Sequence, residues 1–474
     1  MTSVLTPDIC VIGAGSGGLS VAAAAAAFGV PVVLIEKGKM GGDCLNYGCV
    51  PSKSLIAAAN RVEIMTHSRA LGVSADSVTI LPEAVHDHIH KVIAAIAPND
   101  SRERFAGLGV QVIEGAARFK NKDTVAVGDV EIKARRFVIA TGSSPAVPSI
   151  RGLAETPHLT NETVFDLAET PQHLIVIGAG PIGLELAQAW RRLGAKVTVV
   201  EALTPLAKDD PECAAIVLEH LAHDGVTIRA GVNVVAVTGT RGKVTLALAS
   251  PAGGETITGT HLLVAAGRKA NVDDLDLDAA GITHDKHGIV VDKGLRTSNR
   301  RVYAIGDVAG ALQFTHVANY HAGLVIRNAL FRMPVKVKHD IVPWVTFTDP
   351  ELAQVGLTEA EAVKRGHEIR VLRWPYHEND RAQTERKVHG HIKAITTKRG
   401  RILGATIVGA DAGELIALWA LALAQGLNIR ALTGMVVPYP TLGEISKRAA
   451  ITFFTPGLTS PFVRRIIALL RRFG

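Results

Sequence analysis

Two cysteines, Cys44 and Cys49, are the residues whose type and spacing indicate chemistry most directly. Four residues separate them, on a segment that runs from a Gly-Gly turn into a predicted helix. Such cysteines can form a reversible disulfide, and a helix N-terminus lowers the pKa of a thiol. Zinc binding would require a two-residue spacing and a second Cys or His pair, which the sequence lacks, and two inert thiols would leave the flanking Gly-Gly and Pro-Ser-Lys unexplained. We therefore expect a redox-active pair and no metal site.

The bulk composition favours a reducing compartment and a large α/β core. The chain has 474 residues, 47% of them apolar and 4% aromatic, which suits two or three domains built from buried parallel strands flanked by helices. Its four cysteines are too few for a secreted disulfide scaffold. The longest apolar run, residues 415–424, is too short to span a membrane and predicts a core helix. The N-terminal residues lack a signal-peptide pattern, so we expect a cytoplasmic protein.

The elements that must position the cysteines come from a unit that occurs twice. Residues 9–36 and 174–201 each contain, within 28 residues, an apolar strand, a Gly turn, a helix with several alanines, a Gly stop, a second strand and a terminal Glu. The turn of each unit has the pattern G-x-G-x-x-G, formed by Gly13, Gly15 and Gly18 in the first and by Gly178, Gly180 and Gly183 in the second.

This pattern predicts a dinucleotide site in each unit. One glycine makes a tight turn, one lets the backbone approach a pyrophosphate, and one allows close packing of the helix on the strand. The helix N-terminus then offers free N–H groups to the phosphates. Glu36 and Glu201 each follow their first glycine by 23 residues, where a carboxylate accepts hydrogen bonds from a ribose. Two units therefore predict two bound nucleotides.

The end of the second unit favours NADH over NADPH. A 2′-phosphate beside Glu201 would be repelled, and residues 202–205 contain no arginine to receive it. Lys208 and Arg229 are the basic residues that would have to fold in to accept NADPH, which stays the alternative.

Residues 41–53 resemble the redox-disulfide signature of the class I pyridine nucleotide–disulfide oxidoreductases, the family of dihydrolipoamide dehydrogenase, glutathione reductase and mercuric reductase. The resemblance extends over essentially the whole chain. Its other motifs are Ala-Thr-Gly at residues 140–142, Gly183-x-Glu185, Ala-Gly-Arg at residues 266–268, Ala-Ile-Gly-Asp at residues 304–307, and two C-terminal segments at residues 343–351 and 404–409.

The resemblance implies a fold and a set of domains. We expect an α/β protein with two Rossmann-like dinucleotide-binding domains, for FAD and NAD, and an α+β C-terminal dimerisation domain that forms a homodimer. The expected boundaries are 1–150 and 271–340 for the two parts of the FAD domain, 151–270 for the NAD(P) domain, 341–458 for the dimerisation domain and 459–474 for a tail. The implied electron route runs from NAD(P)H through FAD to the cysteine pair.

The resemblance also implies roles for individual residues. Cys49 is expected to lie against the flavin as the charge-transfer thiolate, and Cys44 to be the outer thiol that meets the substrate. Lys53 is expected near flavin N5, paired with Glu185, and Asp307 is expected to bind the ribityl chain. The remaining expected cofactor contacts are Gly42, Thr141, Gly142 and Gly267.

Residues 439–444 depart from the thiol-reducing members of the family. Those members have His-Pro-Thr-x-x-Glu, in which the dimer partner's His, held by the Glu, protonates the leaving thiol. This chain has Tyr439 in that position, with the Pro-Thr and Glu444 in register. A phenol with an ordinary pKa of about 10 is a poor proton shuttle near neutrality compared with an imidazole at about 6.5. Tyr439 as a packed interface aromatic, and compensation by His316 or His321, are the alternatives.

Mercuric reductases resemble the chain at this point, because they also carry the tyrosine. They have in addition a C-terminal cysteine pair, whereas this sequence has no cysteine after Cys213. We therefore expect a mercuric reductase-like NAD(P)H oxidoreductase whose acceptor is a small molecule, a metal ion or a quinone. A dihydrolipoyl dehydrogenase and a membrane-associated flavin redox sensor without fast turnover are the alternatives.

The C-terminal residues 459–474 carry most of the excess positive charge. The net charge is +7, and the residues after Glu444 include six Lys or Arg and no acidic residue, so this excess does not indicate nucleic-acid binding. Ser460 and Pro461 predict the start of a helix whose apolar residues share one arc, with four arginines on the other. Residues 461–474 therefore predict a helix that binds either the inner face of a membrane or the protein's own surface.

Overall fold

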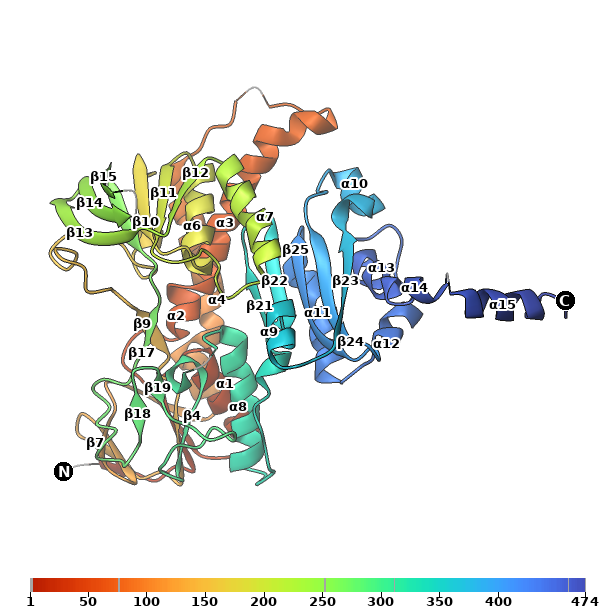
Figure 1. Cartoon of the computed structure of the whole chain (residues 1–474). Helices are drawn as coiled ribbons and strands as arrows, with labels where there is room; N and C mark the ends of the chain where they lie inside the picture. Colours follow the sequence, from red (N-terminus) through yellow and green to blue (C-terminus); the bar gives the residue numbers. More distant parts are fainter. Residues whose placement is uncertain (1–2, 76, 251–252, 311, 459, 474) are drawn as a thin grey trace. The chain divides into compact units, whose positions relative to one another are not determined.

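The computed structural model describes residues 3–75, 77–250, 253–310, 312–458 and 460–473. The chain folds into two compact units (Figure 1). The first contains the described residues up to Ala202 together with Thr227–Val337, and the second contains Leu203–Val226 and the described residues from Lys338.

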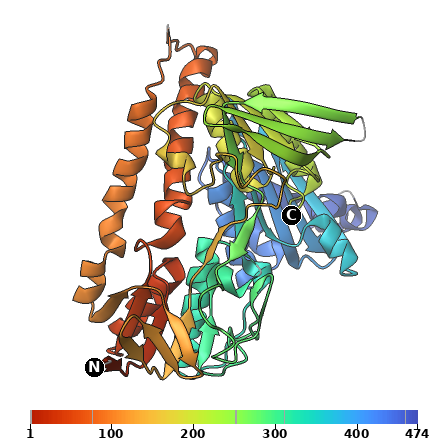
Figure 2. The ribbon, with the colours of Figure 1, turned by 90° about the vertical axis from the view of Figure 1, so that its left-hand side faces the viewer.

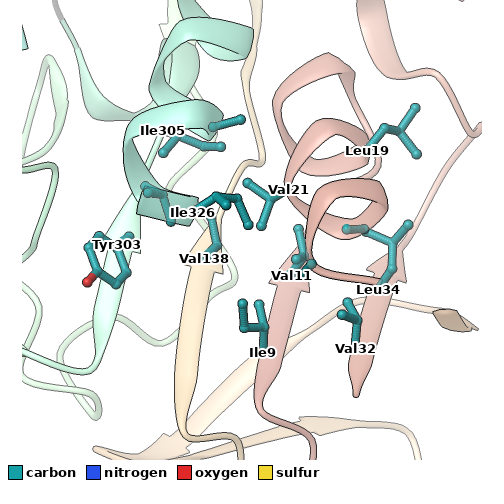
Figure 3. Packing of buried hydrophobic residues seen from close by; sticks show 14 of the residues in the cluster. Ile9, Val11, Leu19, Val21, Val32, Leu34, Val138, Tyr303, Ile305 and Ile326 are labelled. Carbon is teal, nitrogen blue, oxygen red and sulfur yellow. The ribbon is translucent and has the colours of Figure 1, made fainter. Parts of the chain in front are cut away.

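A five-stranded parallel sheet lies at the centre of the first unit. Its strands are, in spatial order, β20 (Val302–Ala304), β8 (Arg136–Ile139), β2 (Ile9–Ile12), β3 (Val32–Glu36) and β4 (Val110–Glu114). The inner strands β2 and β3 are buried on both faces, which explains why they are nearly continuous apolar runs, whereas the edge strand β4 alternates buried and exposed residues. Helices α1 (Ser16–Ala27) and α8 (Thr315–Ala329) pack on one face, where Val21 of α1 and Ile326 of α8 lie beside Val11 and Val138 of the strands (Figure 3).

A second parallel sheet repeats this arrangement with the other glycine motif. Its strands are β12 (Val226–Ala230), β11 (Lys196–Glu201), β10 (His173–Ile177) and β16 (His261–Val264), and α6 (Pro181–Arg192) follows β10. The antiparallel strands β13 (Asn233–Thr240), β14 (Lys243–Ser250) and β15 (Gly253–Gly259) cover one face through a shared apolar cluster. The repeat in the sequence is thus a repeat in the fold.

The redox segment connects the two parallel sheets. Helix α2 (Gly42–Asn46) is followed by α3 (Cys49–His67), which packs against α6 and against α4 (Pro82–Ile96). Figure 2 shows α3 and α4 as two long helices side by side. The remaining elements of this unit are α5 (Arg102–Gly107), β1 (Ser3–Leu5), β5 (Arg118–Asn121), β6 (Thr124–Val127), β7 (Val130–Ile132), β9 (Ser143–Pro145), β17 (Arg268–Ala270), β18 (His284–Asp285) and β19 (Gly288–Ile289).

The second unit is built on an antiparallel sheet. Its strands are, in spatial order, β21 (Pro343–Thr346), β22 (Glu351–Gly356), β25 (Ile402–Gly409), β24 (His391–Thr397) and β23 (Ile369–Pro375). Helix α11 (Ala412–Ala424) packs on β22 and β25 and buries Trp419, which confirms the predicted core helix at residues 415–424. The other helices are α9 (Glu359–Lys364), α10 (Asp380–Glu385), α12 (Ile429–Gly434), α13 (Glu444–Thr452) and α14 (Thr455–Leu458).

Helix α7 (Pro211–His223) also belongs to the second unit, although the sequence places it between strands of the first. It is attached by a charge cluster around Lys393, whose side chain is only 5% exposed. The Lys393 ammonium lies 2.8 Å from Asp210, 3.0 Å from Glu212 and 2.8 Å from Glu359. Three carboxylates around one buried ammonium compensate its loss of hydration.

The chain ends in helix α15 (Pro461–Leu470). Ser460 caps it by accepting a hydrogen bond from Val463 N at 3.3 Å, and Pro461 opens the first turn, as the sequence predicts. None of its residues is buried, and Phe462, Ile467 and Leu470 are at least half exposed. The described part of the chain contains no helix with the length and hydropathy of a membrane-spanning segment.

Candidate active site

The two glycine turns have the same atomic surroundings. Gly13 has φ 103° and Gly178 has φ 108°, and a Cβ at either position would collide with the carbonyl oxygen of Ala140 or Ala265. A Cβ at Gly18 or Gly183 would collide with the carbonyl of the first glycine in its own motif. A Cβ added at either middle glycine, Gly15 or Gly180, would meet no atom within 4 Å, so the space beside each turn is open to a ligand.

Each turn offers unpaired donors to a diphosphate. Gly15 and Gly180 are the N-cap residues of α1 and α6, and neither helix has a side-chain cap. The first N–H groups of a helix have no intrahelical partner and favour an anion. Glu36 and Glu201 are fixed beside these turns, because Glu36 accepts a hydrogen bond from Ala14 N at 2.6 Å and Glu201 one from Ala179 N at 2.8 Å. The residues present therefore fit two dinucleotides.

The cysteine pair lies against the first turn. Cys44 is in α2 and Cys49 opens α3, and both thiols are free. Gly42, with φ 60°, precedes Cys44 by two residues, and a Cβ there would lie 2.8 Å from Gly15 Cα. Glycine at both positions thus lets the redox segment touch the dinucleotide turn.

The environment makes the two thiols unequal. A hydrogen bond from the Cys44 thiol, a hydrogen bond with Thr315 and the charge of Lys53 together lower the pKa of Cys49 to about 6, against the effect of its burial. The same Cys44–Cys49 hydrogen bond, with burial, raises the pKa of Cys44. At neutral pH the pair is therefore a Cys49 thiolate next to a Cys44 thiol.

Thr315 is a site residue that the sequence did not indicate. Its Oγ1 lies 3.3 Å from Cys49 Sγ, although the two residues are 266 positions apart in the sequence. It opens α8, and the only sequence signal was its position shortly after the motif that ends at Asp307. The neighbouring histidines have other contacts: the His316 ring stacks on Phe314, and His321 Nδ1 accepts a hydrogen bond from Gly306 N at 3.2 Å.

Lys53 and Glu185 meet as a short ion pair. Lys53 Nζ of α3 lies 2.7 Å from Glu185 Oε2 of α6, and the Glu185 side chain is 7% exposed. The structure thus brings a residue of the redox helix against a residue of the second glycine motif.

Asp307 lies in a polar cluster with Arg268. The sequence showed Arg268 only as the last residue of the Ala-Gly-Arg motif and did not indicate this contact. Ser143 Oγ donates to Asp307 Oδ2 at 2.5 Å and accepts from Arg268 Nε at 2.7 Å. Burial raises the pKa of Asp307, against these polar contacts. Thr141 is nearby in sequence and is fixed by a hydrogen bond to Asn271 O at 2.8 Å.

Tyr439 is held by an aspartate of its own unit. Its hydroxyl donates to Asp380 Oδ2 at 2.7 Å, and this bond raises the pKa of the phenol. Glu444, the first residue of α13, contributes a further negative charge. Tyr439 is 69% exposed within the chain, so it is not a packed residue of the unit's core.

Comparison with known proteins gives consistent matches over the whole site. Residues 7–322 match the model of the pyridine nucleotide-disulphide oxidoreductase family, and residues 342–450 match the model of its dimerisation domain. A mercuric reductase from Lysinibacillus sphaericus is 34% identical over 450 residues, which cover 94% of this chain and 82% of the relative. A dihydrolipoyl dehydrogenase from Geobacillus stearothermophilus is 34% identical over 451 residues, which cover 94% of this chain and 95% of the relative.

Solved structures extend the similarity to the fold. The HOCl-induced flavoprotein disulfide reductase RclA from Escherichia coli is 28% identical, and the superposition has a TM-score of 0.83. It covers 94% of this chain and 99% of the RclA chain. A Cu(II) complex of RclA superposes equally well, with a TM-score of 0.84.

Proposed function

Because this chain belongs to the pyridine nucleotide–disulphide oxidoreductase family, we propose that it reduces a Cys44–Cys49 disulfide with NAD(P)H and passes the electrons to an acceptor other than lipoamide or glutathione. Members of the family are FAD-dependent and use NAD(P)H as electron donor. FAD, when bound, supplies the relay for the two electrons of the hydride. NAD(P)H, a proton and the disulfide give NAD(P)⁺ and two thiols, so the step balances. The observation that carries the proposal is the thiol pair, in which Cys49 is acidic and Cys44 is not.

The chain's own residues divide the work at the pair. Cys49 stays a thiolate through the hydrogen bonds of Cys44 and Thr315 and the charge of Lys53. Glu185 orients Lys53 from the opposite helix. Cys44 keeps its proton in the resting enzyme and is the thiol that attacks or binds the acceptor, releasing that proton to solvent as the new bond forms.

The presence of Tyr439 at this position disfavours a disulfide acceptor such as lipoamide or oxidised glutathione. The dimerisation-domain match supports a homodimer, in which the family's partner chain supplies the residue at this position. Here the phenol is already donating to Asp380, and its raised pKa prevents it from acting as a base near neutrality. We therefore infer an acceptor that does not depend on an imidazole, either a thiol-bound metal ion or a quinone.

Steady-state NADH oxidation with lipoamide, oxidised glutathione, mercuric ion and a soluble quinone tests this proposal. We expect turnover with mercuric ion or quinone that is lost in Cys44→Ser, whose bound flavin serves as the folding control. Lipoamide turnover that is strong and survives Tyr439→Phe would instead support a dihydrolipoyl dehydrogenase. If none of the four acceptors supports turnover, the result would favour a redox sensor. The absence of bound flavin would refute the whole proposal.

NADH is the proposed donor. Glu201 lies at the end of β11 with its carboxylate fixed by Ala179 N, where a 2′-phosphate would meet a negative charge. Arg229, one of the two basic residues that could have accepted that phosphate, is paired with Glu255. We expect kcat/KM for NADH to exceed that for NADPH, and Glu201→Ala to reduce the difference.

Helix α15 supports a peripheral location on an anionic membrane. It exposes Phe462, Ile467 and Leu470, and its two arginines are exposed, as are the two that directly follow it. A basic amphipathic helix lies in the interface with its apolar side in the acyl boundary and its cations on anionic headgroups. We expect the full chain to float with anionic liposomes, and a chain ending at residue 458 to float much less. Equal flotation of the two proteins would contradict this location and leave the enzymatic proposal intact.

A further inference from the structure

Asp43 places a negative charge close to both cysteines. It directly precedes Cys44 in the first turn of α2. A Cβ at Gly48, the residue before Cys49, would lie 2.9 Å from Asp43 Oδ2, so the carboxylate is under the turn that joins α2 to α3. The charge of Asp43 raises the pKa of both thiols. Without a compensating positive charge, the Asp43 carboxylate would destabilise the Cys49 thiolate that the proposed reaction requires.

Two residues from distant segments hold this carboxylate, one on each oxygen. Arg268 Nη2 lies 3.2 Å from Asp43 Oδ2, and Asn161 Nδ2 donates to Asp43 Oδ1 at 3.1 Å. Asn161 Nδ2 also lies 3.2 Å from Tyr47 O, within the redox segment itself. Both are largely inaccessible: the Arg268 side chain is 12% exposed, and Asn161 is 8% exposed.

Arg268 is itself fixed in place. Its Nε and Nη2 donate to Ser143 Oγ and Ser143 O, each at 2.7 Å, and Nε lies 3.9 Å from Asp307 Oδ2. The guanidinium therefore lies between two carboxylates, Asp43 of the redox segment and Asp307 of the second FAD motif. A planar, permanently charged fork suits this position, because a lysine could not keep both Ser143 bonds and reach Asp43.

We propose that Arg268 and Asn161 are positioning residues for the redox pair, which fix the Asp43 carboxylate beneath the turn between Cys44 and Cys49 and screen its charge from Cys49. Arg268 opens β17, directly after the Ala-Gly that ends the nucleotide-binding segment, so the network links that segment to the cysteines. This deepens the proposed function, since it rests on Cys49 acting as a thiolate.

The test is the pH dependence of iodoacetamide alkylation of Cys49 in the reduced holoenzyme, followed by peptide mass spectrometry. Cys10 and Cys213 are buried, so the label reports on the redox pair. We expect Arg268→Met to slow alkylation of Cys49 at pH 5 by roughly 5–10-fold, because a rise of one pKa unit removes up to tenfold of the thiolate when the pH lies below both pKa values. Asn161→Ala should act in the same direction and less strongly.

The double variant Asp43→Asn/Arg268→Met separates screening from a general loss of structure. With the carboxylate removed, we expect alkylation at pH 5 to return to within about twofold of the wild-type rate. Unchanged alkylation in Arg268→Met, or a slow rate that the second change does not restore, would overturn the inference. The acceptor plays no part in this measurement. A wild-type Cys49 that is not acidic would defeat the proposed function, whereas an acidic Cys49 that ignores Arg268 would defeat the inference alone.

Discussion

Lys53 Nζ lies 2.7 Å from Glu185 Oε2, across the contact between the helix that begins with Cys49 and the helix of the second glycine motif. The charge of Lys53 is one of the influences that lower the pKa of Cys49, and Glu185 determines where that charge is held. The pair thus joins the acidity of the thiol to the packing of α3 on α6.

Glu185→Gln should slow flavin reduction by NADH more than it changes nucleotide binding. The amide keeps the shape and removes the charge that orients Lys53, so we expect a loss of roughly 10-fold in the rate of flavin reduction, the order of one lost charge-assisted contact. Stopped-flow absorbance measures that rate, and the apparent Kd for NADH from the same data is the control. A weaker Kd with an unchanged rate would contradict the assignment.

Thr315→Val should make Cys49 less acidic. The variant keeps the volume of the threonine and removes a hydroxyl that stabilises the thiolate. Because the pKa of Cys49 is lowered to about 6, wild-type alkylation should fall as the pH drops from 7 to 5, and the midpoint should move upward in the variant. Thr384→Val, which changes an exposed threonine of α10, is the matched control.

Lys393→Met should destabilise the second unit strongly. The change leaves Asp210, Glu212 and Glu359 together without their shared cation, and breaking such a buried pair costs about 3–5 kcal/mol. Lys398→Met is the control, since Lys398 is 63% exposed and its pair with Glu368 contributes about 0–1 kcal/mol. Thermal unfolding followed by circular dichroism compares the two, and equal losses would contradict a buried cluster.

The same cluster around Lys393 should make the folded protein less stable to heat at acid pH. The hydrogen bond from Arg373, with that of Lys393, lowers the pKa of Glu212 to about 2. A carboxyl whose folded pKa is depressed stabilises the fold above its unfolded pKa of about 4.3, and this stabilisation is lost as the pH falls toward the folded value. We expect the thermal midpoint to drop between pH 4.5 and 2, and Glu212→Gln to have a lower midpoint at pH 7 and a shallower drop.

Tyr439→His should increase turnover with lipoamide. The variant restores an imidazole ahead of the Pro-Thr and Glu444, and a positioned acid–base group contributes about 10²–10⁴-fold. We expect a gain of at least tenfold, with turnover of the other acceptors unchanged or lower. Tyr439→Phe removes the hydrogen bond to Asp380 without adding an imidazole, so it separates the two effects of Tyr439→His. An equal gain in both variants would rule out the imidazole as the cause.

The sequence by itself determined the two dinucleotide units, the redox pair and the start of the C-terminal helix. These features are local: a glycine turn, an apolar strand or an N-cap is specified by residues within one turn or strand of each other, so their spacing can be read along the chain. The repeat was visible for the same reason, because both turns use glycine where any Cβ would collide with the backbone.

Only the tertiary structure decided which residues act on the thiols. Thr315, Arg268 and Asn161 reach the redox segment from positions more than 100 residues away, and no periodicity relates them to the cysteines. The acidity of Cys49 depends on those contacts, because hydrogen bonds and nearby charges set a pKa through distances that only the folded chain fixes. The pairing of Tyr439 with Asp380 was hidden in the same way, since the sequence pointed to Glu444.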